Sequence, residues 1–135
     1  MNIFSKSIFT DIINRFPEFQ NEHIENSELL ELEITNKNNS SFGGLVIQTT
    51  ADNQIWVRNY QRYSGYYIDN TEELIEIING IFSDEILWVI GFKKDTWTET
   101  TLILNGSKIE MENGVTYYIY SWSGMFDKKF EVNEI

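Results

Sequence analysis

The chain has 135 residues, 41% hydrophobic and 15% aromatic, which is enough for one domain with its own core over residues 1–135. It has no cysteine, which excludes disulfides and thiolate sites, and we find no signal peptide and no apolar run long enough to cross a bilayer. We therefore expect a cytoplasmic protein. The net charge of −11 disfavours direct binding to nucleic acid or to an anionic membrane and favours a basic protein partner, although solubility alone could also explain it.

The N-terminal third predicts a helix followed by a strand. Ile8, Ile12, Phe16 and Phe19 recur at three- and four-residue steps, which is typical of a helix that Pro17 ends or kinks. We expect Ser5 or Ser7 to cap its start. From residue 30 to residue 35 apolar and polar side chains alternate, which predicts a half-buried strand with an acidic outer face.

Two further strands are predicted in the stretches "FGGLVIQTT" and "QIWVRNYQRY". In the second of them Trp56, Arg58, Tyr60 and Arg62 share one face. Aromatic rings interleaved with arginine could stack on nucleic-acid bases, but the acidic flanks favour sheet packing or protein contact. We expect Trp56 to lie in the core.

The stretch "DNTEELIEIINGIFSD" predicts the clearest helix of the chain. Its apolar stripe consists of Leu74, Ile77, Ile78, Ile81 and Phe82. Asp69, Asn70 or Thr71 can cap it, and Glu72 and Glu73 fall in the first turn, where carboxylates favour the positive end of the helix dipole.

The C-terminal part reads as strands only. "EILWVIGF" predicts a central strand with Trp88 in the core, and "TWTETTLIL" returns after the turn "KKD" with Trp97 and Glu99 on the same face. "NGSKIEMENGVTYYIYSWSG" predicts a hairpin around Asn113-Gly114, and "KKFEVNEI" a last short strand. The whole order predicts an α+β fold with a mainly antiparallel sheet of about six to eight strands and two principal helices.

The sequence offers little for catalysis. His23 is the only histidine and lies in the acidic run "NEHIEN", where we expect a solvated side chain; a histidine metal centre or a catalytic triad is therefore disfavoured. No phosphate-binding loop is present. Two carboxylates could hydrolyse a glycoside, but sequence spacing does not place such a pair. We expect a binding protein with no catalytic residues, no metal and no cofactor.

Two acidic tracts, residues 18–33 and residues 69–85, each hold six carboxylates and no Lys or Arg. A solvated helix face explains Glu72 and Glu73 in the second tract. It does not explain why no lysine follows at four-residue spacing, where it would stabilise the helix. A negative field that speeds the docking of a basic partner is the alternative explanation.

The run "IWVRNYQRYSGYYIDNTEELIEIINGIFSDEILWVIGFKKDTWTETTL" resembles small bacterial immunity proteins of contact-dependent growth inhibition and related polymorphic toxin systems. The resembling features are the "IWVR" strand, the aromatic segment that opens into an acidic helix, the apolar strand and the "W-T-E-T" strand. The resemblance implies a cytoplasmic protein that binds one cognate toxin domain and blocks it. Such toxins are often basic nucleases, and an acidic inhibitor can imitate the charge of their substrate.

Local chemistry suggests which residues would bind this partner. We expect Tyr63, Tyr66 and Tyr67 as aromatic anchors, Asp69, Glu72 and Glu73 as the charged groups, and Trp97 with Glu99 beside them if their strand packs next to the helix. The expected mechanism is occlusion of the toxin's active site. The alternatives are a single-stranded nucleic-acid-binding module, a general adaptor and a carboxylate enzyme.

Overall fold

The computed structural model describes residues 1–59 and 65–132. Its elements, in chain order, are α1 (Ile3–Arg15), the 3-10 helix η1 (Pro17–Asn21), β1 (His23–Asn26), β2 (Leu30–Ile34), β3 (Leu45–Thr49), β4 (Ile55–Asn59), β5 (Tyr66–Ile68), α2 (Thr71–Phe82), β6 (Ile86–Lys93), β7 (Thr96–Leu104), β8 (Val115–Tyr120) and β9 (Lys128–Glu131). The strands form two antiparallel sheets, sheet A with the order β1-β2-β3-β4-β5 and sheet B with the order β7-β6-β8-β9. The predicted α+β fold with two principal helices is confirmed, and the described residues hold nine strands, one more than the upper end of the expected range.

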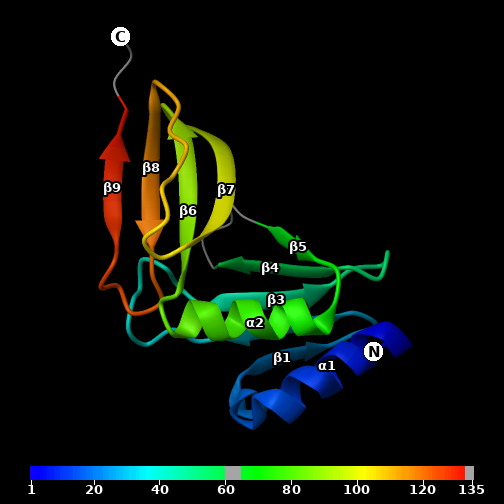
Figure 1. Cartoon of the computed structure of the whole chain (residues 1–135). Helices are drawn as coiled ribbons and strands as arrows, with labels where there is room; N and C mark the ends of the chain where they lie inside the picture. The colour runs from blue at the N-terminus through cyan, green and yellow to red at the C-terminus, as the bar shows by residue number, and fades with distance from the viewer. Residues whose placement is uncertain (60–64, 133–135) are drawn as a thin grey trace.

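Helices α1 and α2 lie along sheet A, and sheet B stands beside it with its strands at a steep angle to those of sheet A (Figure 1). Strands β2 and β4 alternate between buried and half-buried positions, so each sends one face of side chains inward. These inward side chains, with the apolar stripes of both helices, form the main core. Its buried members include Ile12, Leu32, Ile47, Val57, Leu74 and Ile78.

Helix α1 begins earlier than expected, because its N-cap is Asn2, whose Oδ1 accepts a hydrogen bond from the backbone N–H of Ser5 at 2.8 Å. The prediction of Ser5 or Ser7 as the cap was therefore wrong. Ser5 belongs to the first turn of α1 and is buried, and its hydroxyl hydrogen-bonds to the hydroxyl of Thr49 on β3. Its polar group thus joins helix to sheet instead of capping the helix. The helix ends at Arg15, two residues before Pro17, as expected.

Helix α2 agrees with the sequence prediction. Its N-cap is Asn70, whose Oδ1 accepts a hydrogen bond from the backbone N–H of Glu73 at 2.9 Å. Leu74, Ile78 and Ile81 are fully buried against sheet A. The cap and the apolar stripe together fix which sides of this helix remain available for a partner.

Strand β6 is buried on both faces, which accounts for its continuous apolar sequence. Trp88 and Ile90 point into the main core, and the prediction that Trp88 is a core residue is confirmed. Leu87 and Val89 point to the opposite face, where they form a smaller second core with Val115, Tyr117 and Ile119. A central strand with two buried faces therefore divides the apolar interior in two.

Aromatic rings fill the corner between the two sheets. Phe42 contacts Trp88 of β6 edge-on, with ring centroids 6.0 Å apart, and contacts Trp122 at 5.4 Å. Trp122 in turn lies 4.6 Å from Phe82 at the end of α2. A continuous series of ring contacts thus connects sheet B to α2.

The predicted hairpin around Asn113-Gly114 was wrong in its first arm. Residues 107–112 are not a strand. Strand β8 is hydrogen-bonded to β6 on one side and to β9 on the other, so neither of its edges is left for this segment. The segment instead crosses the second core, where Ile109 packs and the backbone N–H of Glu112 donates to the Tyr117 hydroxyl at 2.9 Å.

Strand β1 was not predicted, because its four residues, His23 to Asn26, carry no clear apolar alternation. It is defined by pairing with β2, a contact that the local sequence does not reveal. Its main consequence is electrostatic, since it places Glu25 directly opposite Glu31 on the outer face of sheet A.

Replacing Gly80 of α2 by Ala should destabilise the protein, even though alanine is the better helix former by about 1 kcal/mol. A Cβ at Gly80 would meet the Ile86 side chain, with Cγ1 only 2.6 Å away. We expect the free energy of unfolding, measured by urea denaturation, to fall by about 1–3 kcal/mol because of this overpacking.

The neighbouring exposed position is the matched control. Asn79→Ala should raise the free energy of unfolding by about 0.5 kcal/mol, as helix propensity alone predicts. In an Ile86→Ala background the penalty of Gly80→Ala should largely disappear. Stabilisation by Gly80→Ala in the native background would contradict the close packing of α2 on β6.

Candidate functional site

Two of the expected site residues, Tyr66 and Glu73, line the same groove. The groove has a volume of about 420 Å³ and lies between α2, β5 and the neighbouring ends of β6 and β7. Its lining consists of Tyr66, Glu73, Glu76, Ile77, Gly80, Glu85, Ile86, Leu102, Ile103 and Leu104. Three of these described side chains are carboxylates and none is basic. We call this site the acidic groove.

Helix geometry brings two carboxylates of α2, those of Glu73 and Glu76, to the acidic groove. Glu73, Glu76, Ile77 and Gly80 follow at three- and four-residue steps and therefore share one side of the helix. Glu85 adds a third carboxylate from the turn into β6. The acidic side of the groove is thus built from the second acidic tract of the sequence.

Apolar side chains complete the groove. Tyr66 is 36% exposed and Leu104, at the end of β7, is 65% exposed, so both leave apolar surface open to solvent. Leu102 and Ile86 are half-buried beside them. An apolar surface next to carboxylates suits the side chain of lysine or arginine, whose methylene stem packs on apolar groups while its charge pairs with a carboxylate.

The expected charged residues do not all face this groove. Glu72 lies on the side of α2 that faces α1, where it lines a shallow hollow with Asp11 and Arg15. Asp69 is exposed in the turn before the helix. Consecutive helix residues are rotated by about 100°, so Glu72 and Glu73 cannot act on the same partner group. The structure therefore separates a pair that the sequence had grouped together.

The expected aromatic anchors are also separated. Tyr66 and Tyr67 are consecutive in β5 and point to opposite faces of sheet A. Tyr67 stacks on Trp56 of β4, with ring centroids 6.1 Å apart and an interplanar angle of 15°. Tyr63 lies outside the described residues.

The prediction that Trp56 lies in the core was wrong. It is half-buried on the outer face of sheet A, in register with Gln48 and Tyr67. Gly65 packs against the indole nitrogen so closely that a Cβ there would overlap it. The alternation of β4 explains the outcome, because Ile55 and Val57 already occupy the inward face.

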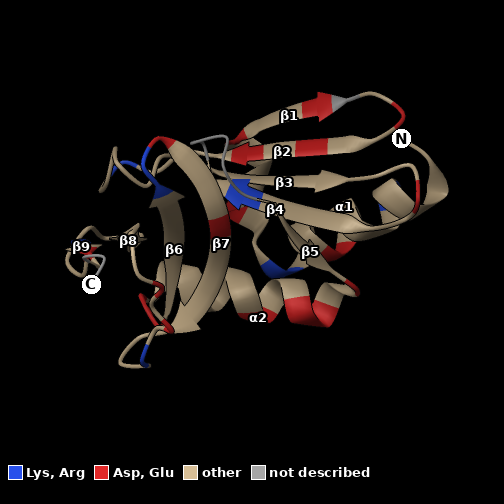
Figure 2. Ribbon diagram, turned by 90° about the horizontal axis from the view of Figure 1, so that it is seen from above, with Lys and Arg blue, Asp and Glu red and all other residues tan. Residues whose placement is uncertain are grey.

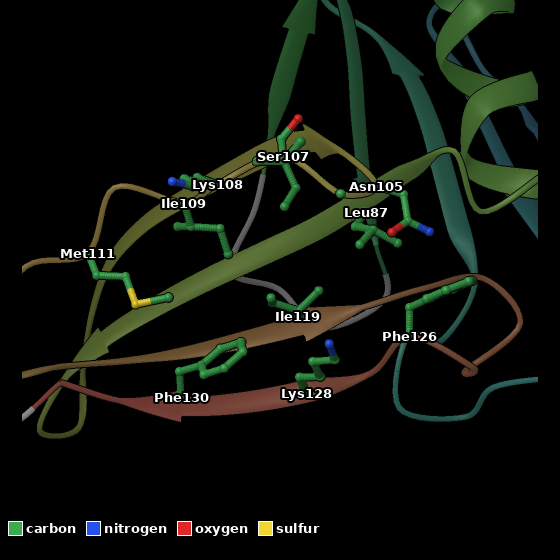
Figure 3. A pocket seen from close by; sticks show the side chains of 12 residues that line it. Leu87, Asn105, Ser107, Lys108, Ile109, Met111, Ile119, Phe126, Lys128 and Phe130 are labelled. Atoms are coloured by element: carbon green, nitrogen blue, oxygen red, sulfur yellow. The ribbon is translucent and has the colours of Figure 1, made fainter.

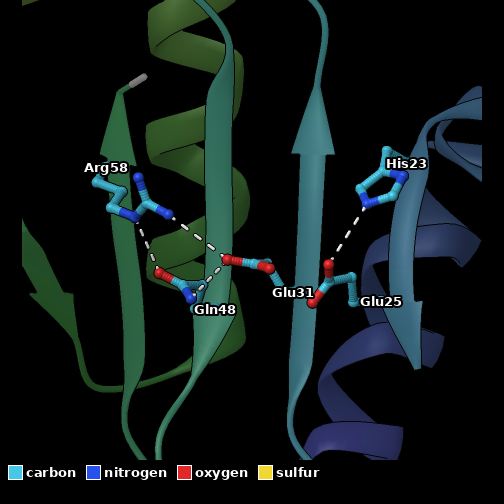
Figure 4. Close-up of polar contacts among 5 residues, drawn as sticks. All are labelled: His23, Glu25, Glu31, Gln48 and Arg58. Atoms are coloured by element: carbon cyan, nitrogen blue, oxygen red, sulfur yellow. Dashed lines mark hydrogen bonds and ion pairs between the residues drawn. The ribbon is translucent and has the colours of Figure 1, made fainter. Parts of the chain in front are cut away.

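Arg58 belongs to a polar network on the same outer face (Figure 4). Its Nε donates to Gln48 Oε1 at 3.0 Å, and Gln48 Nε2 donates to Glu31 Oε1 at 2.9 Å. Arg58 Nη2 lies 3.5 Å from the same Glu31 oxygen, and its guanidinium lies 5.6 Å from the centre of the Trp56 ring. This arginine is therefore engaged within sheet A and is not held ready for a phosphate.

The surroundings of Glu31 raise the pKa of its carboxyl. Burial raises the pKa of its carboxyl above the ordinary 4.5, and a hydrogen bond with Glu25 and the charge of Glu25 raise the pKa further, while Arg58 opposes them. Glu25 also lies 3.8 Å from His23, whose side chain is exposed as expected. In Figure 2 the ribbon is red, which marks Asp and Glu, along parts of β1 and β2 and in the first half of α2.

Trp97 and Glu99 do not share a face, contrary to the sequence prediction. Phe92 pairs with Trp97 but Gly91 pairs with Glu99, so Thr98 is an extra residue that forms a β-bulge. Trp97 consequently lies on the face of Phe92 and donates its Nε1–H to Thr100 at 3.0 Å. Glu99 lies on the other face, where it contributes to the raised pKa of Tyr117, which burial mainly causes.

Sequence reasoning missed Glu76, Glu85 and Leu104 as members of the acidic groove. The spacing of Glu73 and Glu76 could have identified one of them, but Leu104 reaches the groove only through the pairing of β7 with β6. In the described residues, no three His, Cys, Asp or Glu side chains are placed to share a metal ion. None of the described helices is long and apolar enough to cross a membrane.

Charge is unevenly distributed along the chain. Residues 1–85 hold 14 acidic and five basic side chains, whereas residues 86–135 hold seven and five. Sheet A and the helices therefore carry most of the negative charge.

No protein-family model, curated protein or solved structure matches the chain.

Replacing Glu25 by Gln should stabilise the protein at neutral pH. The carboxyl of Glu31, whose pKa is raised in the folded protein, binds its proton more tightly there than in the unfolded chain. The contribution of this proton to the free energy of unfolding is therefore lost as the pH rises from 4.5 through the raised pKa. Removing the facing like charge should raise the free energy of unfolding at pH 7 by about 0.2–1 kcal/mol. Urea denaturation at pH 7 and pH 4 should show a smaller gain at pH 4.

Glu28→Gln is the control, because it removes one carboxylate from the turn between β1 and β2 with no carboxylate facing it in the register. An equal gain from both substitutions at pH 7 would mean that only the total charge matters, and would contradict a specific Glu25–Glu31 interaction.

Proposed function

We propose that the protein is an inhibitor of the immunity-protein type, which binds a basic protein domain and covers the surface on which that domain acts. Its cognate partner would be a toxin domain, and the class that fits the charge is a nuclease. The proposed role is binding in the cytoplasm, without a reaction of its own. The observation that carries the proposal is the acidic groove, in which three carboxylates stand beside exposed apolar side chains.

The chemistry of the groove favours a basic protein over other partners. Glu73, Glu76 and Glu85 would repel a phosphate backbone, whereas Lys and Arg side chains could pair with them. Tyr66 and Leu104 provide apolar contact area next to these charges, and protein interfaces combine an apolar centre with a polar rim. The concentration of acidic residues before residue 86 would also steer a basic partner toward sheet A and α2.

Occlusion is the mechanism that these features support. A nuclease binds a polyanion through clustered lysines and arginines, and a second polyanionic surface competes for the same groups. The resemblance of residues 55–102 to immunity proteins leads to the same partner class and includes most of the acidic groove. Tyr67, on the opposite face of sheet A, is not part of this proposed contact.

A second candidate function is supported by one observation. On one face of sheet B, the Phe92 and Tyr118 rings lie 5.9 Å apart, Tyr118 and Tyr120 are stacked at 6.3 Å, and the Lys129 ammonium lies 5.7 Å from the Tyr118 ring. Such rings beside a lysine could stack on the bases of a single strand. The net charge of the chain opposes this alternative.

Reversing the charge of Glu73 should weaken the binding of the toxin domain. The binding partner to test is the C-terminal domain of any large secreted protein that the gene directly upstream encodes. Glu73→Lys places a like charge against the basic partner and should raise Kd about tenfold or more, measured by calorimetry. The same variant should protect cells less well against that toxin.

Glu72→Lys is the matched control. It changes the net charge and the first turn of α2 by the same amount as Glu73→Lys, but it faces α1 instead of the acidic groove. Its Kd should change less than about threefold, since only screened, long-range attraction is lost. Equal effects of both variants would show that the groove is not the contact, and no binding of any such domain would contradict the proposed function.

A titration with labelled single-stranded RNA separates the two candidates. For an inhibitor of this charge we expect no change in fluorescence anisotropy at about 0.1 M salt. Binding that Tyr118→Ala abolishes and Tyr67→Ala leaves unchanged would favour the nucleic-acid function instead.

A further inference from the structure

A second cavity lies on sheet B, on the face turned away from the main core (Figure 3). Its volume is about 370 Å³. Leu87 of β6 and Ile119 of β8 form its floor, while Ile109 and Met111 from the segment after β7 and Phe130 from β9 form its walls. Its only residue in common with the acidic groove is Ile103.

This cavity exists because the second core is thinly covered. Only five residues of that core are buried, and the segment over it, residues 107–112, has no regular structure. Met111 is 44% exposed and Phe130 is 37% exposed, so apolar walls remain open to solvent. An apolar cavity of this size is in the range that small molecules occupy in proteins.

Lys128 gives the cavity its chemical character. It pairs in register with Ile119, which places it on the same face as the apolar floor, and Figure 3 shows its side chain directed from β9 toward the cavity. Within the described residues its side-chain ammonium forms no ion pair and no hydrogen bond. Its neighbour Lys129 lies on the opposite face and pairs with Glu131 at 3.3 Å.

The other polar side chains that line the cavity are either basic or neutral. Lys108 is at the rim, and Asn105 and Ser107 are neutral. None of the described residues that line the cavity is acidic, although the chain as a whole carries 21 acidic side chains. The cavity is therefore a cationic and apolar site on an acidic protein.

We propose that this cavity binds a small amphipathic carboxylate, of the class of a medium-chain fatty acid. The apolar chain lies over Leu87 and Ile119, and the carboxylate pairs with Lys128. The unpaired ammonium excludes apolar cations, and the apolar walls disfavour small hydrophilic anions such as phosphate. A lone polar head with an apolar body matches both properties of the site.

The test uses decanoate as the probe, with decanol and decyltrimethylammonium as probes of the same chain length. Methyl NMR of the full chain at concentrations below micelle formation reports on Ile109 and Ile119 in the cavity and on Ile12 in the main core. We expect decanoate to shift the cavity methyls in a saturable way, decanol to bind more weakly, and Ile12 to stay unchanged. Shifts with decyltrimethylammonium as large as those with decanoate, or no saturable shift with decanoate, would overturn the proposal.

Variants of β9 test the role of Lys128. Lys128→Met keeps an apolar stem and should weaken decanoate binding about tenfold, since a charge-assisted hydrogen bond is lost. Lys129→Met, on the opposite face of the same strand, should bind decanoate as the native chain does. Lys128→Glu should no longer bind decanoate and should bind decyltrimethylammonium instead. A variant that is merely unfolded would bind neither.

Equal loss in Lys128→Met and Lys129→Met would overturn the assignment to this cavity. An acidic peptide that competes with decanoate and binds more tightly would overturn the small-molecule class, and would make the cavity a protein-docking site.

Discussion

Strand β6 is buried on both faces, and the rest of the chain is arranged to cover it. Sheet A and the two helices cover the face that carries Trp88 and Ile90, with the rings of Phe42, Trp122 and Phe82 filling the corner between the layers. The opposite face is covered by an irregular segment, which contributes Ile109, and by the side chains of Phe126 and Val132. This imbalance explains why the first core is closed and the second contains a cavity.

The same helix that closes the main core also divides the charges of the molecule. Because α2 buries Leu74, Ile78 and Ile81, its carboxylates must point to one side or the other of that stripe. Glu73 and Glu76 fall toward β7, and Glu72 falls toward α1. On the outer face of sheet A, in contrast, Arg58 and Gln48 already hold Glu31. In the part of the chain that the structure describes, no ion pair engages the carboxylates of Glu73, Glu76 and Glu85, so the charges of the acidic groove are available to a partner.

Local patterns were sufficient where an element is defined by its own residues. The spacing and cap of α2 and the apolar run of β6 predicted both elements, and Tyr66 and Glu73 were correctly placed near one another. Patterns failed where pairing with a distant strand decides the structure, as for β1, for the first arm of the expected hairpin and for Leu104 in the groove. Alternation also failed at Trp56, since it indicates which residues share a face but not which face is inward.

The bulge at Thr98 shows how a strand can accommodate one additional residue without changing its partners. Its one additional residue places Trp97 beside Phe92 and Glu99 beside Gly91, on opposite surfaces of sheet B. Loss of that single codon from the gene, with the pairing of β6 and β7 kept on both sides, would leave Trp97 opposite Phe92 and Glu99 opposite Gly91, so both side chains would stay on their present surfaces. The strand can therefore change its length by one residue at this point without changing the chemistry of either surface of sheet B.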